Sequence, residues 1–439
     1  MSAQTQLSTH ATTISRIVGS VVDAGRDILA KRRQNASLSA PSTELVAQCR
    51  ELLEHRGEAS GLALASEICD RFQTFDESDY HNFFECLATE FDVDNGDILQ
   101  ASSHYREEPS FYNLNALAKS VEAPRLKLFR RLNMAPNGTH VLVELRGHLL
   151  PLLKSKPHWR GVDTDLRHLF VSWFNKGFLE MRRIDWNSPA QVLEKIIDYE
   201  AVHEISGWDD LRNRLHQDRM CFAFFHPAMP DDPLVFVEIA LTRGMPDAIA
   251  PLLSQDREQT EQHKFDTVVF YSISNCHPGL AGVSFGNFLI KHVVEEVRQE
   301  IPGIKTFVTL SPVPGFRSWL QQAEIGELVA GELADRVREP VTEVIAADVR
   351  DALMKLCAHY LLQVKSGTLA KDPVARFHLG NGAQLHRLNW GADLSAKGKE
   401  QSAGIMVNYL YDLDKIEVNH DAYFDQGEIS ASKAVRKLL

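Results

Sequence analysis

The chain has 439 residues, of which 44% are hydrophobic and 24% are charged, and this composition is typical of a soluble protein of two or three domains. Lysine and arginine together number 47 and aspartate and glutamate 59, which gives a formal net charge of −12. That balance argues against a broad surface for nucleic acid or for an anionic membrane, although it leaves room for a local basic pocket.

Cysteine spacing and hydropathy indicate a reducing compartment. The six cysteines are scattered, at positions 49, 69, 86, 221, 276 and 357. They show neither CxxC spacing nor a cluster with histidine, so we expect reduced thiols and no structural zinc or other metal site. No apolar run approaches the roughly 20 residues that span a bilayer, and the C-terminal RKLL differs from the peroxisomal signal SKL. We therefore expect a cytosolic protein without a membrane partner.

The first 35 residues are rich in serine and threonine and poor in acids, a weak similarity to a transit peptide. The same stretch has apolar residues at helical spacing, among them Val18, Val22, Ile28 and Leu29. This spacing favours an ordinary amphipathic helix at the N-terminus.

Apolar residues keep a helical spacing up to about residue 186. In residues 42–56, for example, Leu45, Cys49 and Leu52 fall on one stripe. The same spacing predicts further helices over residues 60–75, 79–91, 123–134 and 163–184. The aromatic pairs Phe83–Phe84 and Phe170–Trp173 are expected in the core. Because this half lacks a cluster of catalytic residue types, we expect residues 1–186 to form an all-α domain used as a scaffold or for oligomerisation.

The pattern changes to alternating strands and helices in the second half. Strand-like runs cover residues 220–227, 233–242, 265–274 and 304–313. Helical runs between them cover residues 207–217, 247–255 and 284–300. This order predicts a mixed sheet flanked by helices, and it makes residues 187–439 the catalytic candidate.

A glycine-containing loop, residues 277–283, joins the third strand to the helix expected to begin near Ser284. Helix N-termini offer free N–H donors, and Gly279, Gly282 and Gly286 would let a phosphate group approach the backbone. The segment matches neither GxGxxG nor GxxxxGK[ST], so from the residues alone a simple structural turn remains the alternative.

His378 lies in DPVARFHLGNGAQLHRLNW, residues 372–390, just before a Gly-Asn-Gly turn at 380–382. An imidazole exchanges protons near neutral pH, and its placement before the turn could expose this one. A packed histidine is the alternative interpretation.

Two further polar candidates lie at strand ends. Ser311 follows the strand over 304–310, where its hydroxyl either points into a cleft or simply stabilises a turn. Alternation along residues 404–413 places Tyr409 and Tyr411 on one face of another strand, from which one of them can reach the site.

Four segments, residues 270–297, 309–320, 372–395 and 404–413, occur in the order found in malonyl-CoA decarboxylases, and the chain resembles that family over most of its length. The resemblance implies an α+β multidomain fold, with an N-terminal helical assembly domain followed by a mixed α/β acyl-CoA domain like that of the GNAT acyltransferases. It implies decarboxylation of malonyl-CoA to acetyl-CoA and carbon dioxide without a cofactor or metal. It also implies a homo-oligomer formed through the helical domain.

The resemblance implies roles for individual residues as well. Backbone amides around Leu280, Ala281, Gly282 and Val283 would bind the CoA pyrophosphate. His378 would protonate C2 of the substrate.

Ser311 would orient the malonyl group and hydrogen-bond His378, and Tyr411 would make a polar contact in the site. Asn381 is a weaker candidate for a substrate contact, with a turn residue as its default explanation. His386 has no such support and is interpreted as structural.

One position departs from the family pattern: many relatives carry a glutamate where this chain has Ser284. Either Ser311 and His378 suffice, or another polar group such as Asn275 or Asn408 compensates. Two other functions use the same kind of fold, namely transfer of the acyl group to an amine and noncatalytic sensing of acyl-CoA.

Overall fold

The computed structural model describes residues 18–26, 41–55, 57–256, 264–283, 288–329, 331–342 and 345–439. The chain divides into two compact units. Unit 1 comprises Met1–Glu180, Phe225–Leu234 and Asn275–Phe285, and unit 2 comprises Met181–Phe224, Val235–Ser274 and Gly286–Leu439. Two short segments from the second half of the sequence thus belong to the first unit.

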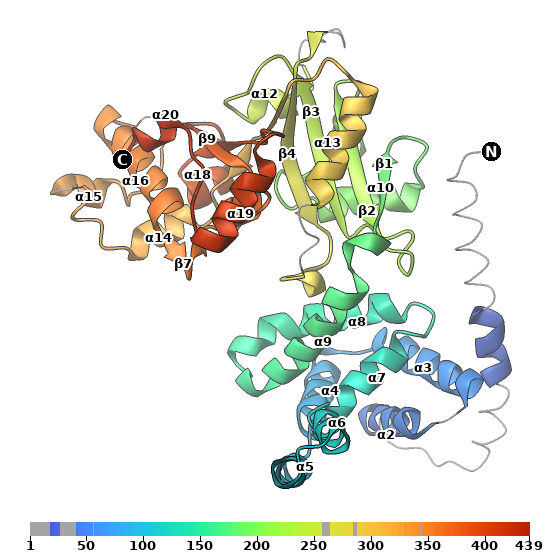
Figure 1. Ribbon diagram of the computed structural model, residues 1–439. Helices are drawn as coiled ribbons and strands as arrows, with labels where there is room; N and C mark the ends of the chain where they lie inside the picture. Colours follow the sequence, from blue (N-terminus) through green and yellow to red (C-terminus); the bar gives the residue numbers. More distant parts are fainter. Residues whose placement is uncertain are drawn as a thin grey trace. The chain divides into compact units, whose positions relative to one another are not determined.

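Unit 1 is built mainly of helices, drawn in blue to green in Figure 1. They are α2 (Pro41–Glu54), α3 (Glu58–Phe72), α4 (Glu77–Thr89), α5 (Asn95–Glu107), α6 (Phe111–Ser120), α7 (Pro124–Leu132), α8 (Gly138–Leu149) and α9 (Arg160–Trp173). Residues 18–26 are also helical, whereas the rest of the N-terminal stretch considered for a transit peptide lies outside the described residues. The predicted helices over 42–56, 60–75, 79–91 and 123–134 are confirmed as α2, α3, α4 and α7.

Local capping explains where several of these helices begin. The Asp76 carboxylate accepts the Asp79 N–H at 2.9 Å, and the Asp79 carboxylate accepts the Asp76 N–H at 3.3 Å, which forms a capping box at the start of α4. At the start of α6 the Ser110 hydroxyl accepts the Asn113 N–H and so caps that helix. Buried aromatic rings then fill the unit, and Phe83, Phe84 and Phe170 are buried as expected while Trp173 is only partly buried.

The predicted helix over 163–184 is wrong in its second half. Helix α9 ends at Trp173, and residues Glu180–Ile184 form strand β1 of the sheet. The Asn175 side chain accepts the Gly177 N–H at 2.8 Å, a local turn that competes with helix continuation.

Unit 2 contains an eight-stranded mixed sheet in the order β1-β2-β3-β4-β5-β10-β6, with β9 paired to β10. The strands are β1, β2 (Arg219–Phe225), β3 (Val235–Thr242), β4 (Thr267–Asn275), β5 (Thr306–Thr309), β6 (Ser311–Pro312), β9 (Gln384–Asn389) and β10 (Met406–Leu410). Strands β4 and β5 run parallel, while β10 runs antiparallel to β5, β6 and β9. The four predicted strands and the mixed character of the sheet are confirmed.

Helices cover and extend this sheet. They are α10 (Ala190–Tyr199), α11 (Trp208–Arg214), α12 (Ala250–Leu253), α13 (Phe288–Glu300), α14 (Phe316–Gln322), α15 (Glu332–Arg336), α16 (Ala347–Gln363), α17 (Pro373–Gly380), α18 (Ala396–Ser402), α19 (Ile416–Gln426) and α20 (Lys433–Arg436), with a small hairpin of β7 (Lys365–Ser366) and β8 (Leu369–Ala370). Figure 1 shows α13 lying against one face of the sheet. No helix in the described part of the chain is both long and apolar enough to cross a membrane.

Strand β10 pairs with other strands of unit 2, namely β5, β6 and β9. Its register places Val407 opposite Ser311 of β6 and Leu410 opposite Val308 of β5. The register with β9 shifts between Asn408 and Tyr409. A bulge of this kind re-aims the side chains beyond it.

Candidate active site

The three residues predicted to be catalytic form one hydrogen-bonded chain in unit 2. The Ser311 hydroxyl lies 3.0 Å from His378 Nε2, and His378 Nδ1 lies 2.8 Å from the Tyr411 hydroxyl. All three side chains are buried, with residue exposures of 7%, 4% and 3% respectively. These hydrogen bonds connect Ser311 of β6, His378 of α17 and Tyr411, the residue that follows β10.

His378 is held by a helix and not by a turn. The Gly-Asn-Gly segment does not expose this residue, since α17 continues to Gly380 and His378 is only 4% exposed. The helix begins where Asp372 accepts the N–H groups of Val374 and Ala375, each at 3.0 Å, with proline at its first position. The His378 ring stacks on Tyr409, with ring centroids 4.7 Å apart.

Thr309 is a further member of the site that the sequence alone did not single out. The Ser311 hydroxyl donates to Thr309 Oγ1 at 2.9 Å, and the same oxygen accepts the Tyr409 N–H at 3.2 Å. With its hydrogen directed to Thr309, Ser311 accepts from Nε2–H of His378, and Nδ1 then accepts from Tyr411. Thr309 and Ser311 are two residues apart, so strand alternation was the signal that could have paired them.

Burial sets the protonation state of this chain. Desolvation lowers the pKa of His378 from 6.5 to about 3, so the imidazole is neutral near pH 7. Burial also raises the pKa of Tyr411 well above its usual value of 10, which keeps the phenol protonated. The site thus holds a neutral imidazole between two hydroxyl groups.

The asparagine candidates have different surroundings. Asn408 is fully engaged: its amide nitrogen donates to the Thr309 carbonyl at 2.8 Å, and its oxygen accepts from Asn389 and Arg387 at 2.9 and 3.0 Å. Its amide therefore holds the end of β5 against β10. Asn275 lies exposed at the end of β4, outside unit 2.

Asn381 caps the C-terminal end of α17, and its amide nitrogen donates to the Phe377 carbonyl at 2.7 Å. Its side-chain oxygen is buried and has no hydrogen-bond partner in the described part of the chain. The Tyr409 hydroxyl is in the same situation. Both residues lie next to His378, since Asn381 follows it on α17 and the Tyr409 ring stacks on it.

The predicted phosphate loop belongs to unit 1 and forms a tight turn. Three of its four candidate amides donate within the loop, Leu280 to His277, Ala281 to Pro278 and Val283 to Leu280, each at 3.0 Å. The fourth, Gly282, has a φ of +74°, and its N–H donates to none of the described residues. Ser284 and Gly286, which the sequence places next, lie outside the described residues.

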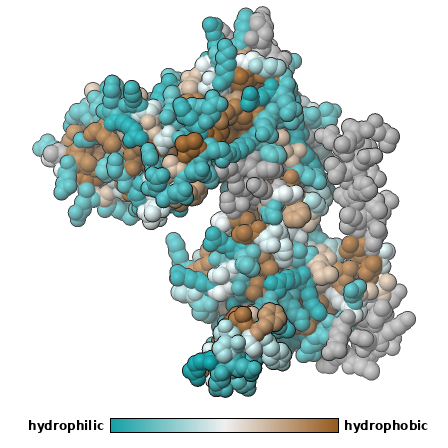
Figure 2. Space-filling view, viewed as in Figure 1, coloured by the Kyte–Doolittle hydropathy of each residue, from teal (hydrophilic) through white to brown (hydrophobic). Residues whose placement is uncertain are grey.

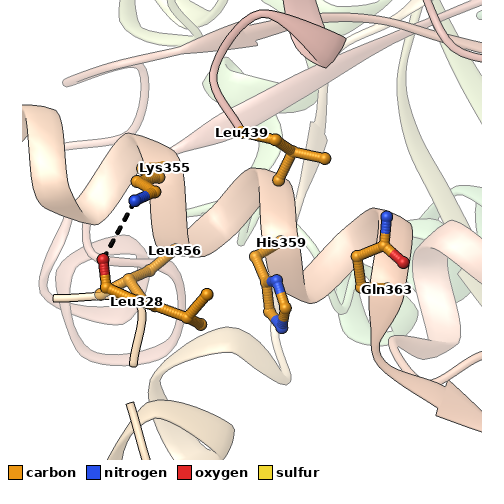
Figure 3. A pocket seen from close by; sticks show the side chains of 6 residues that line it. All are labelled: Leu328, Lys355, Leu356, His359, Gln363 and Leu439. Carbon is orange, nitrogen blue, oxygen red and sulfur yellow. Dashed lines mark hydrogen bonds between the residues drawn. The ribbon is translucent and has the colours of Figure 1, made fainter. Parts of the chain in front are cut away.

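Two pockets in unit 2 are formed by other residues. One is lined by Leu328, Lys355, Leu356, His359, Gln363 and Leu439, and Figure 3 shows the Lys355 ammonium donating to the Leu328 carbonyl, at 3.0 Å. The second is lined by Ile197, Asp198, Glu200, Ala201, Val202, Glu204, Ile205 and Lys397. Neither pocket contains a predicted catalytic residue. Within the described ranges, histidine, cysteine and acidic side chains form no group able to hold a metal ion.

Two family models match this chain over most of its length. The model of the malonyl-CoA decarboxylase C-terminal domain matches residues 177–439, and that of the N-terminal domain matches residues 91–174. The chain belongs to the malonyl-CoA decarboxylase family. The family suggested by the four sequence motifs is thus confirmed, as is the fold of a helical part followed by a mixed α/β part.

Relatives and solved structures agree with this assignment. Mitochondrial malonyl-CoA decarboxylases of Anser anser anser and Rattus norvegicus are each 36% identical, over 80% and 89% of this chain and 78% and 85% of their own lengths. The crystal structure of malonyl-CoA decarboxylase from Rhodopseudomonas palustris is similar with a TM-score of 0.86 at 48% identity, covering 91% of this chain and 100% of that one. That from Agrobacterium vitis has a TM-score of 0.82 at 47% identity, covering 90% and 99%.

Proposed function

We propose that this chain decarboxylates malonyl-CoA to acetyl-CoA and carbon dioxide. The observation that carries the proposal is the buried Ser311–His378–Tyr411 hydrogen-bonded chain in a member of this family. The substrate's own thioester carbonyl accepts the electron pair released when the carboxylate leaves, so the reaction does not intrinsically require a metal or an organic cofactor. What the protein must supply is orientation of the malonyl group and one proton at C2.

Ser311 and His378 act together in the proton transfer. The bond between C2 and the carboxylate breaks, and its electrons form the thioester enolate. Ser311 gives its proton to C2 and regains one from Nε2–H of His378, which lies 3.0 Å away. Tyr411, 2.8 Å from Nδ1, gives its proton to the ring and regains one from water, and the hydroxide that is left combines with the released carbon dioxide. The ring then carries its hydrogen on Nδ1, and exchange with water returns it to Nε2 before the next turnover. In this scheme His378 protonates the substrate through Ser311 and not directly.

The CoA pyrophosphate binds the loop over residues 277–283. Gly282 supports this role because its left-handed backbone leaves an N–H without a partner among the described residues. The other three amides are already used inside the turn. Binding through them would require the turn to open.

The decisive experiment incubates the purified protein with malonyl-CoA alone, without an amine or added metal. Stoichiometric acetyl-CoA and carbon dioxide are expected. Loss of the thioester only when an amine is added would instead identify an acyltransferase, and saturable binding without any product would identify a sensor. Either result contradicts the proposal.

The pH dependence distinguishes a neutral imidazole from an imidazolium acid. Because burial lowers the pKa of His378 to about 3, kcat should stay constant as the pH rises through 6.5. An imidazolium with an ordinary pKa of about 6.5 would lose its proton, and kcat would fall over that range. The pH profile of kcat at saturating malonyl-CoA makes this comparison, and a tenfold fall between about pH 6 and pH 8 would contradict the neutral form.

Self-association is proposed to use the α5–α6 hairpin. Neither helix has a buried residue, although helices of 13 and 10 residues are marginal when isolated. Leu99, Phe111 and Tyr112 are 72%, 85% and 80% exposed. Figure 2 shows hydrophobic surface in this part of the helical unit. A second copy of the chain would cover this surface.

Replacing Phe111 and Tyr112 with serine should therefore convert the protein to a species of lower mass in light scattering after size exclusion, because the exposed aromatic area drives the association. The control is Val418→Ser, which changes an equally exposed apolar residue (69%) on α19. An unchanged mass for the double variant would contradict the use of this surface.

The compartment is proposed to be the cytosol. All six cysteines are buried and carry free thiols, as expected in a reducing environment.

A further inference from the structure

We propose that Arg146, on helix α8 of the helical unit, is a positioning residue for the nucleotide end of the substrate. It fixes the orientation of the loop over residues 277–283, so that the Gly282 amide is available to a diphosphate. This inference rests on the proposed binding of CoA pyrophosphate by that loop. It gives the helical part of the chain a role in substrate affinity.

Arg146 bonds the loop at two places. Its Nη1 donates to the carbonyls of Gly279 at 2.6 Å and Ala281 at 2.8 Å, while its Nε pairs with Asp163 of α9 at 2.7 Å. The residue is only 2% exposed. A second arginine, Arg167, donates to the Gly282 carbonyl at 3.2 Å. Cations of the helical unit thus hold the carbonyls of three loop residues.

These bonds decide which way the loop's N–H groups point. In a trans peptide the C=O and the following N–H point in opposite directions. Since Arg146 holds the Ala281 carbonyl, the N–H of Gly282 points away from the guanidinium. The carbonyl dipoles that would repel an anion are turned toward the arginines at the same time. By binding the Ala281 carbonyl, Arg146 thus leaves the Gly282 N–H free to face a ligand and turns the carbonyl oxygen away from it.

The loop also sits directly on the backbone of α8. A Cβ atom added to Gly279 would lie 1.8 Å from the Val143 carbonyl oxygen and 3.0 Å from the Gly147 nitrogen. Only glycine fits at position 279. This residue therefore has no side chain that could fix the loop, and the bonds from Arg146 to the loop carbonyls do so instead. The start of the loop has separate anchors, since Cys276 N–H donates to the Leu234 carbonyl at 3.0 Å and His277 lies 3.4 Å from Asp232. Replacing Arg146 should thus loosen residues 279–282 while Cys276 and His277 stay in place.

The test compares malonyl-CoA with malonyl-pantetheine, which carries the same reacting group but no phosphate. For Arg146→Gln we expect KM for malonyl-CoA to rise by about tenfold or more, as charge-assisted bonds are lost, with kcat within about twofold of wild type. KM for malonyl-pantetheine should not change. Arg146→Lys keeps the charge and one donor direction, and it should give an intermediate KM for malonyl-CoA.

Arg125→Gln is the matched control. Arg125, on α7, is 6% exposed and is also held by aspartates, Asp92 at 2.7 Å and Asp165 at 2.6 Å. It donates to the Leu87 carbonyl at 3.2 Å, and these partners all lie outside the loop. This variant should lose thermal stability to a similar degree as Arg146→Gln while keeping the wild-type ratio of the two KM values.

The outcomes separate this inference from the proposed function. Equal KM changes for both substrates in Arg146→Gln, or a wild-type KM ratio in Arg146→Lys if the glutamine variant does not fold, would overturn the positioning role alone. A wild-type protein with the same KM for both substrates would overturn phosphate binding by the loop, and the positioning role with it. A wild-type protein that converts neither substrate would overturn the decarboxylase function itself.

Discussion

Replacing His378 with alanine should lower kcat for malonyl-CoA decarboxylation by about a thousandfold, within the range by which a positioned proton donor accelerates a reaction. The imidazole is the only group that hydrogen-bonds Ser311 on one side and Tyr411 on the other, at 3.0 and 2.8 Å, among the residues described. In the proposed relay, Ser311 cannot regain the proton that it gives to C2 when the imidazole is absent. Binding of CoA should change far less, because we propose that the pyrophosphate binds the loop over residues 277–283 and not this ring.

Ser311→Ala should cause a loss of similar size, and the double variant should be hardly worse than either single one, since the two residues act as a unit. The control is His386→Ala, on strand β9, which removes a partly buried histidine that takes no part in the hydrogen bonds between Ser311, His378 and Tyr411. Steady-state kinetics together with circular dichroism make the comparison. A folded His378→Ala enzyme that keeps more than about a tenth of wild-type kcat would contradict the relay.

Replacing Arg214 with methionine should lower the free energy of unfolding by about 3–5 kcal/mol, the typical result of removing one partner of a buried ion pair. Arg214 on α11 pairs with Glu238 of β3 at 2.8 Å and with Asp210 at 3.2 Å, and it also donates to the His203 carbonyl at 3.0 Å. The side chains of Arg214 and Glu238 are 3% and 1% exposed. Loss of the arginine leaves a carboxyl group inside the sheet.

Burial raises the pKa of Glu238, and Arg214 opposes this by stabilising the carboxylate. Glu238 should therefore bind a proton when the arginine is removed. Adding Glu238→Leu to Arg214→Met should restore most of the lost stability, because apolar replacements for both members of a buried ion pair are often neutral. The control is Arg212→Met on the same helix, whose side chain is 70% exposed and whose pairing with Asp209 at 3.3 Å should contribute little. Urea unfolding of the wild type and the three variants provides the measurement, and equal midpoints for Arg214→Met and Arg212→Met would contradict this expectation.

Local signals in the sequence predicted most of the helices and strands but not the tertiary contacts that these elements make. The apolar runs of β2 and β3 identified central strands because both faces of such strands are buried. The predicted helix over 163–184 extended too far because a side-chain contact of Asn175 ends it, and apolar spacing carries no information about such contacts.

The environment of His378 was the harder part. Asp372 and Pro373 are signals of a helix start, but the Gly-Asn-Gly segment suggested a turn, and the imidazole packs against Tyr409 of β10 and Tyr411 just after it, both distant in sequence. The pKa of His378 follows from that burial and not from the neighbouring sequence. Arg146 was missed for the same reason, since it lies 133 residues before the Gly279 carbonyl that it binds.

The loop over residues 277–283 packs on α8, so ligand binding by the loop and the stability of the helical unit are thermodynamically linked. If a ligand binds a loop that rests on Val143 and Gly147, then tight binding requires α8 to be folded, and the binding free energy is linked to the stability of α8. By reciprocity, whatever stabilises the helical unit also favours ligand binding, and the bound ligand in turn protects the helical unit from unfolding. If the loop binds the substrate as proposed, a substitution in α8 that destabilises the helical unit should therefore also weaken substrate binding.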